Sequence, residues 1–298
     1  MKDLADSDLH RELLGMQIIR THFLNCVLEA DPLTEVSNQI SIRLQNVDDP
    51  IRLVMGSAVY GLEAMSSATF FLGASINSLK ALRLLTIQES KNAQGELEIQ
   101  AHITVNGTAG LIRQIVECAA RALWLTDSKL PEDISLRGYA ALWANAEESV
   151  LFAKAIGSPE LKVKEGLLSD LLEIGRSENW INEGGRKPRP TVSLSGATEI
   201  LMKVSFDSGP LKPALGIMGN NVENGEWVYR WLSGMAHGYV WVHPLQKVQS
   251  EESEVDLVWT EPDWVKLTLC ITLAVHLIHL VMDSLQISIT SGGVGAQA

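Results

Sequence analysis

Three residues with chemically useful side chains lie at helical spacing inside one apolar stretch of the chain, residues 224–244. Arg230, Ser233 and His237 stand at positions i, i+3 and i+7, so a helix would place them on one face. Most residues around them are aromatic or aliphatic, which predicts a polar line set in a core. Buried polar groups need hydrogen-bonding partners. We therefore expect this line to meet either polar groups of the fold or a ligand.

A second polar row lies upstream, in a predicted helix over residues 108–126. Arg113, Glu117 and Arg121 follow one another at intervals of four residues, a spacing that usually produces a solvated row of ion pairs. The rest of this helix is apolar nearly all round, which favours an internal row instead. Because unpaired buried charge is costly, an internal row needs a polar partner, and the face of Arg230 is the best candidate. Both interpretations stay open.

The composition describes a globular, acidic chain. Its 298 residues are 46% hydrophobic and 20% charged, enough apolar content for one large core or two smaller ones. The formal net charge of −12 argues against a broad basic surface for duplex DNA or anionic lipid, although a small basic cleft remains compatible with it. Three scattered cysteines without a CxxC spacing predict reduced thiols. We expect neither a cofactor nor a metal.

The most apolar run of the chain, residues 267–282, bears on localisation. It is shorter than the ~20 residues that a membrane span needs, and it contains His276 and His279. We predict a helix that is buried in protein. The N-terminal residues are acidic and lack the apolar region of a signal peptide. The expectation is a cytoplasmic protein with no membrane partner.

The elements that must position the polar residues are predicted to be helices, because apolar residues recur at helical spacing along most of the chain. Residues 97–105 alternate between apolar and polar side chains as a strand would, but no second strand is evident to pair with them. They are interpreted either as a strand or as the segment that leads into the next helix. The expected fold is all-α, a helical bundle with accessory N-terminal helices. We expect an N-terminal helical region over residues 1–90 and a bundle over 97–290, packed as one unit. The predicted helices cover residues 8–30, 33–45, 51–89, 108–126, 131–156, 158–177, 195–204, 224–244 and 261 onward.

The segment Arg230-WLSGMA-His237 resembles the signature of the HEPN superfamily, whose members carry an arginine and a histidine separated by four to six residues on a late helix of a bundle. Together with the upstream RQIVECAARALWL and the loop KPRPTVSLSGATEIL, it looks like a group of uncharacterised bacterial proteins allied to that superfamily. The resemblance covers roughly residues 108–285. One position departs from the pattern of active nucleases, because Trp231 stands where they commonly carry a polar residue.

The resemblance implies a metal-independent endoribonuclease, or a protein that binds RNA or nucleotide, in a bacterial stress or phage-defence system. Such toxin-like proteins often work as homodimers. His237 would be the general acid and base, Arg230 would stabilise charge on the scissile phosphate, and the RNA 2′-hydroxyl would be the internal nucleophile. The alternative is a non-catalytic helical scaffold or interaction protein in which the same residues form a buried network. The supporting residues in either case are Ser233, Glu117, Arg121 and Arg113.

Overall fold

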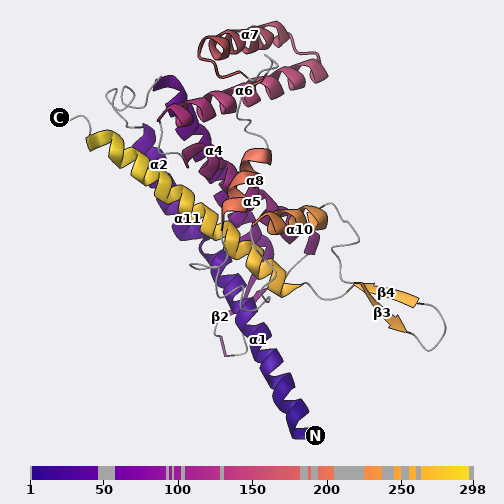
Figure 1. Ribbon diagram of the computed structural model, residues 1–298. Helices are drawn as coiled ribbons and strands as arrows, with labels where there is room; N and C mark the ends of the chain where they lie inside the picture. Colours follow the sequence, from indigo (N-terminus) through magenta and orange to yellow (C-terminus); the bar gives the residue numbers. More distant parts are fainter. Residues whose placement is uncertain are drawn as a thin grey trace. The chain divides into compact units, whose positions relative to one another are not determined.

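The structure, a computed structural model, is predominantly helical (Figure 1). The predicted all-α class is confirmed. The helices are α1 (Lys2–Leu28), α2 (Ala30–Gln45), α4 (Ala58–Thr86), α5 (Val105–Thr126), α6 (Pro131–Ile156), α7 (Leu161–Ser177), α8 (Leu194–Lys203), α10 (Glu226–Ala236) and α11 (Trp264–Val294). The residues that the structure describes are 2–45, 58–91, 94–95, 97–101, 105–127, 131–181, 187–188, 194–204, 225–236, 245–249, 255–259 and 263–294.

Two short antiparallel hairpins accompany the helices. Strand β1 (Ile87–Lys91) pairs with β2 (Leu97–Ala101), and β3 (Leu245–Gln249) pairs with β4 (Val255–Trp259). Within the described parts of the chain, each sheet has two strands. The strand predicted near residue 97 therefore does have a partner, in residues that we assigned to a helix end and a loop. A five-residue strand is too short for its alternation to stand out beside a long helix.

Helix α4 ends at Thr86 and not at the predicted residue 89, because β1 begins directly after it. The described part of α10 reaches Ala236, and residues 237–244 of the predicted helix lie outside the described residues. At the start of α11 the Asp263 carboxylate accepts a hydrogen bond of 3.0 Å from the backbone N–H of Lys266, which caps the helix.

The chain divides into two compact units, each built from three stretches of sequence. Unit 1 comprises residues 1–35, 74–117 and 201–278, and unit 2 comprises residues 36–73, 118–200 and 279–298. Each unit contains residues from both sides of the boundary that we predicted at residues 90–97. That division into an N-terminal region and a bundle stays a prediction.

In unit 1, apolar helix packing is joined by a few polar links. The rings of Phe23 in α1 and Trp264 in α11 meet edge to face with centroids 5.7 Å apart. Between α4 and α5, the Ser75 hydroxyl donates to the Ile115 carbonyl at 3.3 Å, so this buried hydroxyl is satisfied.

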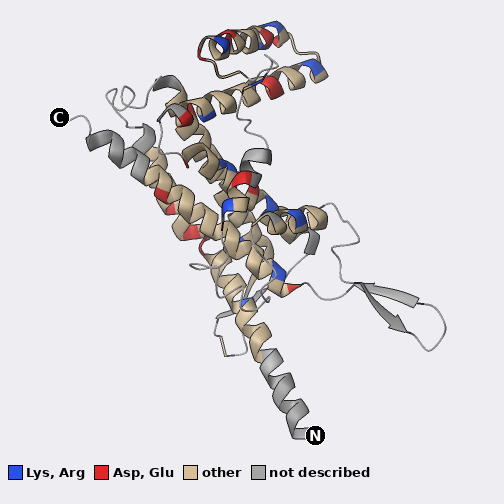
Figure 2. Ribbon diagram, viewed as in Figure 1, with Lys and Arg blue, Asp and Glu red and all other residues tan. Residues whose placement is uncertain are grey.

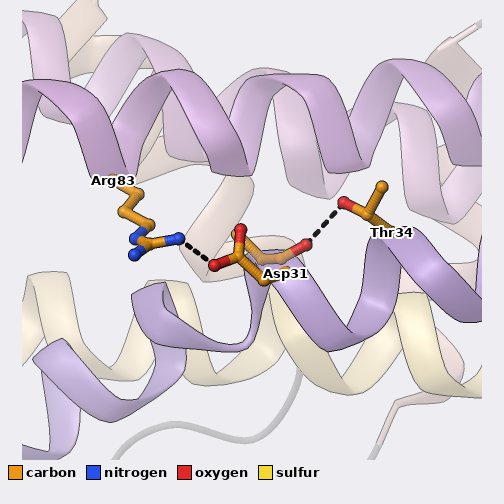
Figure 3. Close-up of polar contacts among 4 residues, drawn as sticks. Asp31, Thr34 and Arg83 are labelled. Carbon is orange, nitrogen blue, oxygen red and sulfur yellow. Dashed lines mark hydrogen bonds and ion pairs between the residues drawn. The ribbon is translucent and has the colours of Figure 1, made fainter.

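An exposed ion pair joins α2 to the last turns of α4. Arg83 donates to the carboxylate of Asp31, and one turn further along α2 the Thr34 hydroxyl donates to the Ala30 carbonyl at 2.6 Å (Figure 3). The Asp31 side chain is 64% exposed, so this pair contributes little to stability. It fixes which face of α2 is turned toward α4.

Helix α11 carries the most apolar run of the chain. Residues 264–286 are long and apolar enough to cross a membrane, a test that core helices of soluble proteins also pass. Inside the protein, 72% of its most apolar window is buried, and residues 267–275 are buried without exception. This burial favours the predicted core helix.

None of the three cysteines lies in a disulfide in the structure. Cys26 and Cys270 are buried, and Cys118 is half-buried. Burial raises the pKa of the Cys26 thiol to about 11 and raises that of Cys270 well above its ordinary value. Because the thiolate is the reactive form, these two cysteines are expected to be inert toward oxidants and alkylating reagents at neutral pH.

The core of unit 2 is organised around Tyr139 of α6, which is fully buried and packs against Trp143, Leu171 and Ile181. Its hydroxyl donates to the Leu171 carbonyl of α7 at 2.7 Å. Gly175 makes this approach possible, because a Cβ at that position would overlap the Tyr139 hydroxyl. An aromatic residue and a glycine thus lock α6 and α7 together.

We expect Tyr139→Phe to lower the unfolding free energy by roughly 0.5–1.5 kcal/mol at neutral pH, the usual net value of one hydrogen bond. Burial raises the pKa of Tyr139 to about 12. The folded state therefore favours the neutral phenol, and its stabilisation is complete below the unfolded pKa of about 10 and is lost as the pH rises toward 12. Urea unfolding at several pH values should show wild type and variant converging above pH ~10. Parallel pH profiles would contradict this role.

Candidate functional site

Helix α10 carries the predicted motif and is anchored by one apolar face. Arg230 is exposed and Ser233 is half-buried, and they lie opposite the anchoring residues. The two described residues of the predicted polar line, Arg230 and Ser233, are therefore not enclosed in the core. The physical reason is ordinary amphipathicity, because the helix buries its apolar side and leaves the polar side to solvent. The buried residues are Val228, Tyr229, Trp231, Leu232 and Met235.

The polar row on α5 meets α10 at Tyr229. The Arg113 guanidinium donates to the Tyr229 hydroxyl at 3.2 Å and lies 5.5 Å from the centroid of its ring. Arg113 Nε lies 3.9 Å from Glu117 Oε2, and the two side chains are 25% and 20% exposed. The row is therefore half-buried, and it contacts the residue next to Arg230. A pairing of this row with Arg230 itself stays a prediction.

Trp231, at the position after the motif arginine, has a packing role. Its ring is buried, stacks nearly parallel to Trp227 with centroids 6.3 Å apart, and has Lys266 Nζ of α11 5.9 Å from its centroid. A polar residue here would remove an anchor of α10. His237, the last residue of the motif, lies outside the described residues.

Arg121 belongs to unit 2. Its guanidinium lies 5.8 Å from the ring centroid of Phe71 in α4, a cation–π distance. It also lines a cavity of about 750 Å³. We did not predict this cavity, because its walls come from α4, α5, α6 and residues 187–188, which are far apart in sequence.

The lining of this cavity carries both signs of charge. Lys187 Nζ lies 3.5 Å from Glu147 Oε1, and the Ser67 hydroxyl donates to Glu63 Oε1 at 3.3 Å. Much of its polarity is thus satisfied by the protein itself. Such a lining selects no single ligand charge.

Among the described residues, no three histidine, cysteine or acidic side chains are grouped as a metal site. The α10 face carries the exposed guanidinium of Arg230, a group that pairs with phosphate or carboxylate oxygens. A neighbouring imidazole from His237 would add proton transfer near neutral pH.

No family model, curated protein or solved structure matches this chain. The resemblance to the HEPN superfamily rests on its motif residues and stays a prediction.

Proposed function

We propose that this protein binds or cleaves RNA or a nucleotide through the face of α10 that carries Arg230, with His237 as acid and base. The exposure of Arg230 supports the proposal, because a guanidinium must be reachable to contact a phosphate. The buried side of α10 adds support, since a charge that is held on an anchored helix is pre-organised for its ligand. A cytoplasmic role in bacterial stress response or phage defence belongs to the same proposal.

The cleavage reaction would need no metal. His237 would take the proton of the RNA 2′-hydroxyl, and the freed oxygen would attack the adjacent phosphorus. The bond from phosphorus to the 5′-oxygen then breaks, that oxygen takes up a proton, and a 2′,3′-cyclic phosphate is left. Arg230 would offset the negative charge that grows on the phosphate oxygens.

A non-catalytic scaffold is the second candidate function. The half-buried contact of Arg113 with Tyr229 favours it, because it links α5 to α10 through groups of the protein itself. In this case Arg230 would belong to a structural network of the fold and would contact no RNA. The two candidates differ in what removal of the Arg230 guanidinium changes.

The proposal is tested with labelled single-stranded RNA and the purified full chain in the presence of EDTA. We expect Arg230→Ala to weaken binding by about 10–100-fold, since hydrogen bonds to charged groups contribute ~1.5–3 kcal/mol. Arg176→Ala is the matched control, because Arg176 is an exposed arginine near the end of α7. Filter binding and gel electrophoresis report binding and cleavage.

If both arginine variants weaken RNA binding equally, the loss follows from net charge alone, and the assignment of Arg230 is overturned. If the wild-type chain neither cleaves RNA nor binds RNA or mononucleotides, the proposed function is overturned and the scaffold is the candidate function that stands.

A further inference from the structure

Helices α6 and α7 form an antiparallel hairpin within unit 2 (Figure 1). Two polar contacts join the two helices in the half next to the connecting turn. Lys154 Nζ lies 3.3 Å from Glu165 Oε1, and Lys164 Nζ donates to Ser149 Oγ at 2.8 Å. These contacts fix how each helix is rotated about its own axis.

That rotation places one group of large apolar side chains on a single side of the hairpin. At 100° per residue, the Lys154–Glu165 pair marks one side, and the apolar group lies on the other side of both helices. The group is Phe152, Ile156, Val163, Leu167 and Ile174, with exposures of 65%, 61%, 75%, 48% and 36%. We name it the apolar hairpin face.

The hairpin does not need this face for its own folding. Its internal contact is made by other residues, including the buried Tyr139, Trp143 and Leu171. Several large exposed apolar side chains on one side of a helix pair, unlike single scattered ones, are typical of an interaction site. The face is therefore available to a partner.

The charges beside the face indicate what kind of partner fits it. The exposed acidic residues Glu148, Glu160 and Asp170 border it on the same helical rotation. Both acidic and basic positions occur along α6 and α7 (Figure 2). A cation close to this border, Lys164, donates a hydrogen bond to Ser149 and lies 3.7 Å from Glu160, so its charge is partly offset. An apolar surface with an acidic border complements an apolar stripe with a basic border.

We propose that the apolar hairpin face binds a basic amphipathic helix of another protein. Such a helix buries its apolar stripe between α6 and α7 and brings its lysines or arginines to Glu148, Glu160 and Asp170. A second copy of this chain would bring acid against acid in a symmetric contact, and anionic lipid would be repelled by the same border.

The test uses a fluorescent helix-forming peptide with a leucine stripe flanked by lysines, and a second peptide with glutamates in place of the lysines. We expect the full chain to bind the lysine peptide at least about tenfold more tightly, with an affinity that falls as salt rises. Leu167→Ser and Phe152→Ser should each weaken binding about tenfold, the effect of losing one apolar contact. Asp170→Lys should weaken the lysine peptide and strengthen the glutamate peptide.

Leu151→Ser is the matched control, because Leu151 is 54% exposed on α6 but lies on the side of Lys154. It should leave peptide binding unchanged, as should Arg230→Ala, which keeps this test separate from the proposed function. Three results would overturn the proposal: equal binding of the two peptides, equal loss in Leu151→Ser and Leu167→Ser, or no binding of the lysine peptide. If analytical ultracentrifugation shows that the wild type is a dimer and Leu167→Ser is a monomer, the apolar hairpin face instead binds a second copy of the chain. Loss of binding to anionic vesicles in Leu167→Ser assigns it to a membrane.

Discussion

Replacing His237 by alanine is expected to reduce RNA cleavage by about 10²–10⁴-fold, the usual contribution of one well-placed acid or base. The melting temperature should stay at the wild-type value, because on the proposed function this imidazole acts on the substrate and not on the fold. Arg230→Ala should reduce cleavage as well as RNA binding. Relief of toxicity on overexpression is the corresponding result in cells.

Thermal unfolding of the same variants separates catalysis from structure. In a scaffold, removing a member of a buried network leaves its partner unpaired, which costs ~1–3 kcal/mol. Glu117→Ala is the comparison variant, because Glu117 pairs with Arg113 in the half-buried row. A lower melting temperature for His237→Ala and Glu117→Ala alike, with no cleavage by the wild type, would contradict the catalytic role.

The long helices could be predicted because their patterns repeat over several turns. In α5, α6 and α7 the observed ends lie within three residues of the predicted ones. The β1–β2 hairpin could not, because β1, with the sequence IQESK, has a single apolar residue and therefore resembles the polar end of the 29-residue helix before it. Its existence depends on cross-strand pairs such as Ile87 with Ala101, which local sequence does not encode.

Spacing along the chain identified which residues share a face but not which way that face points. Arg230 and Ser233 do lie on one side of α10, as the 3.6-residue period requires. The direction of that face depends on what the opposite side of the helix packs against. Tyr229 accepts a hydrogen bond from Arg113, and the ring of Trp231 lies against Lys266. The cavity beside Arg121 is the extreme case, since only the folded chain brings its four segments together.

The largest expected loss of stability from a single methyl group is at Gly138 in α6. A Cβ there would overlap the backbone carbonyl oxygen of Tyr60 and lie 2.8 Å from the backbone nitrogen of Ala64, both in α4. Neither atom belongs to a flexible side chain, so the two helices must separate to make room. We expect Gly138→Ala to lower the unfolding free energy by roughly 1–3 kcal/mol or more.

Gly166→Ala in α7 is the matched control for Gly138→Ala. An added Cβ at Gly166 would meet no atom of the described residues within 4 Å. Alanine has the higher helix propensity, so this variant should be about as stable as wild type or more stable by up to ~1 kcal/mol. Urea denaturation of both variants measures the difference in unfolding free energy. The dependence of that free energy on urea concentration should stay the same if only the native packing changes. Both substitutions add the same methyl group to a helix interior. If the unfolding free energy falls in Gly138→Ala and does not fall in Gly166→Ala, the contact of α6 with Tyr60 is identified as the cause. A Gly138→Ala variant as stable as Gly166→Ala would mean that α4 and α6 are not packed backbone to backbone at this point.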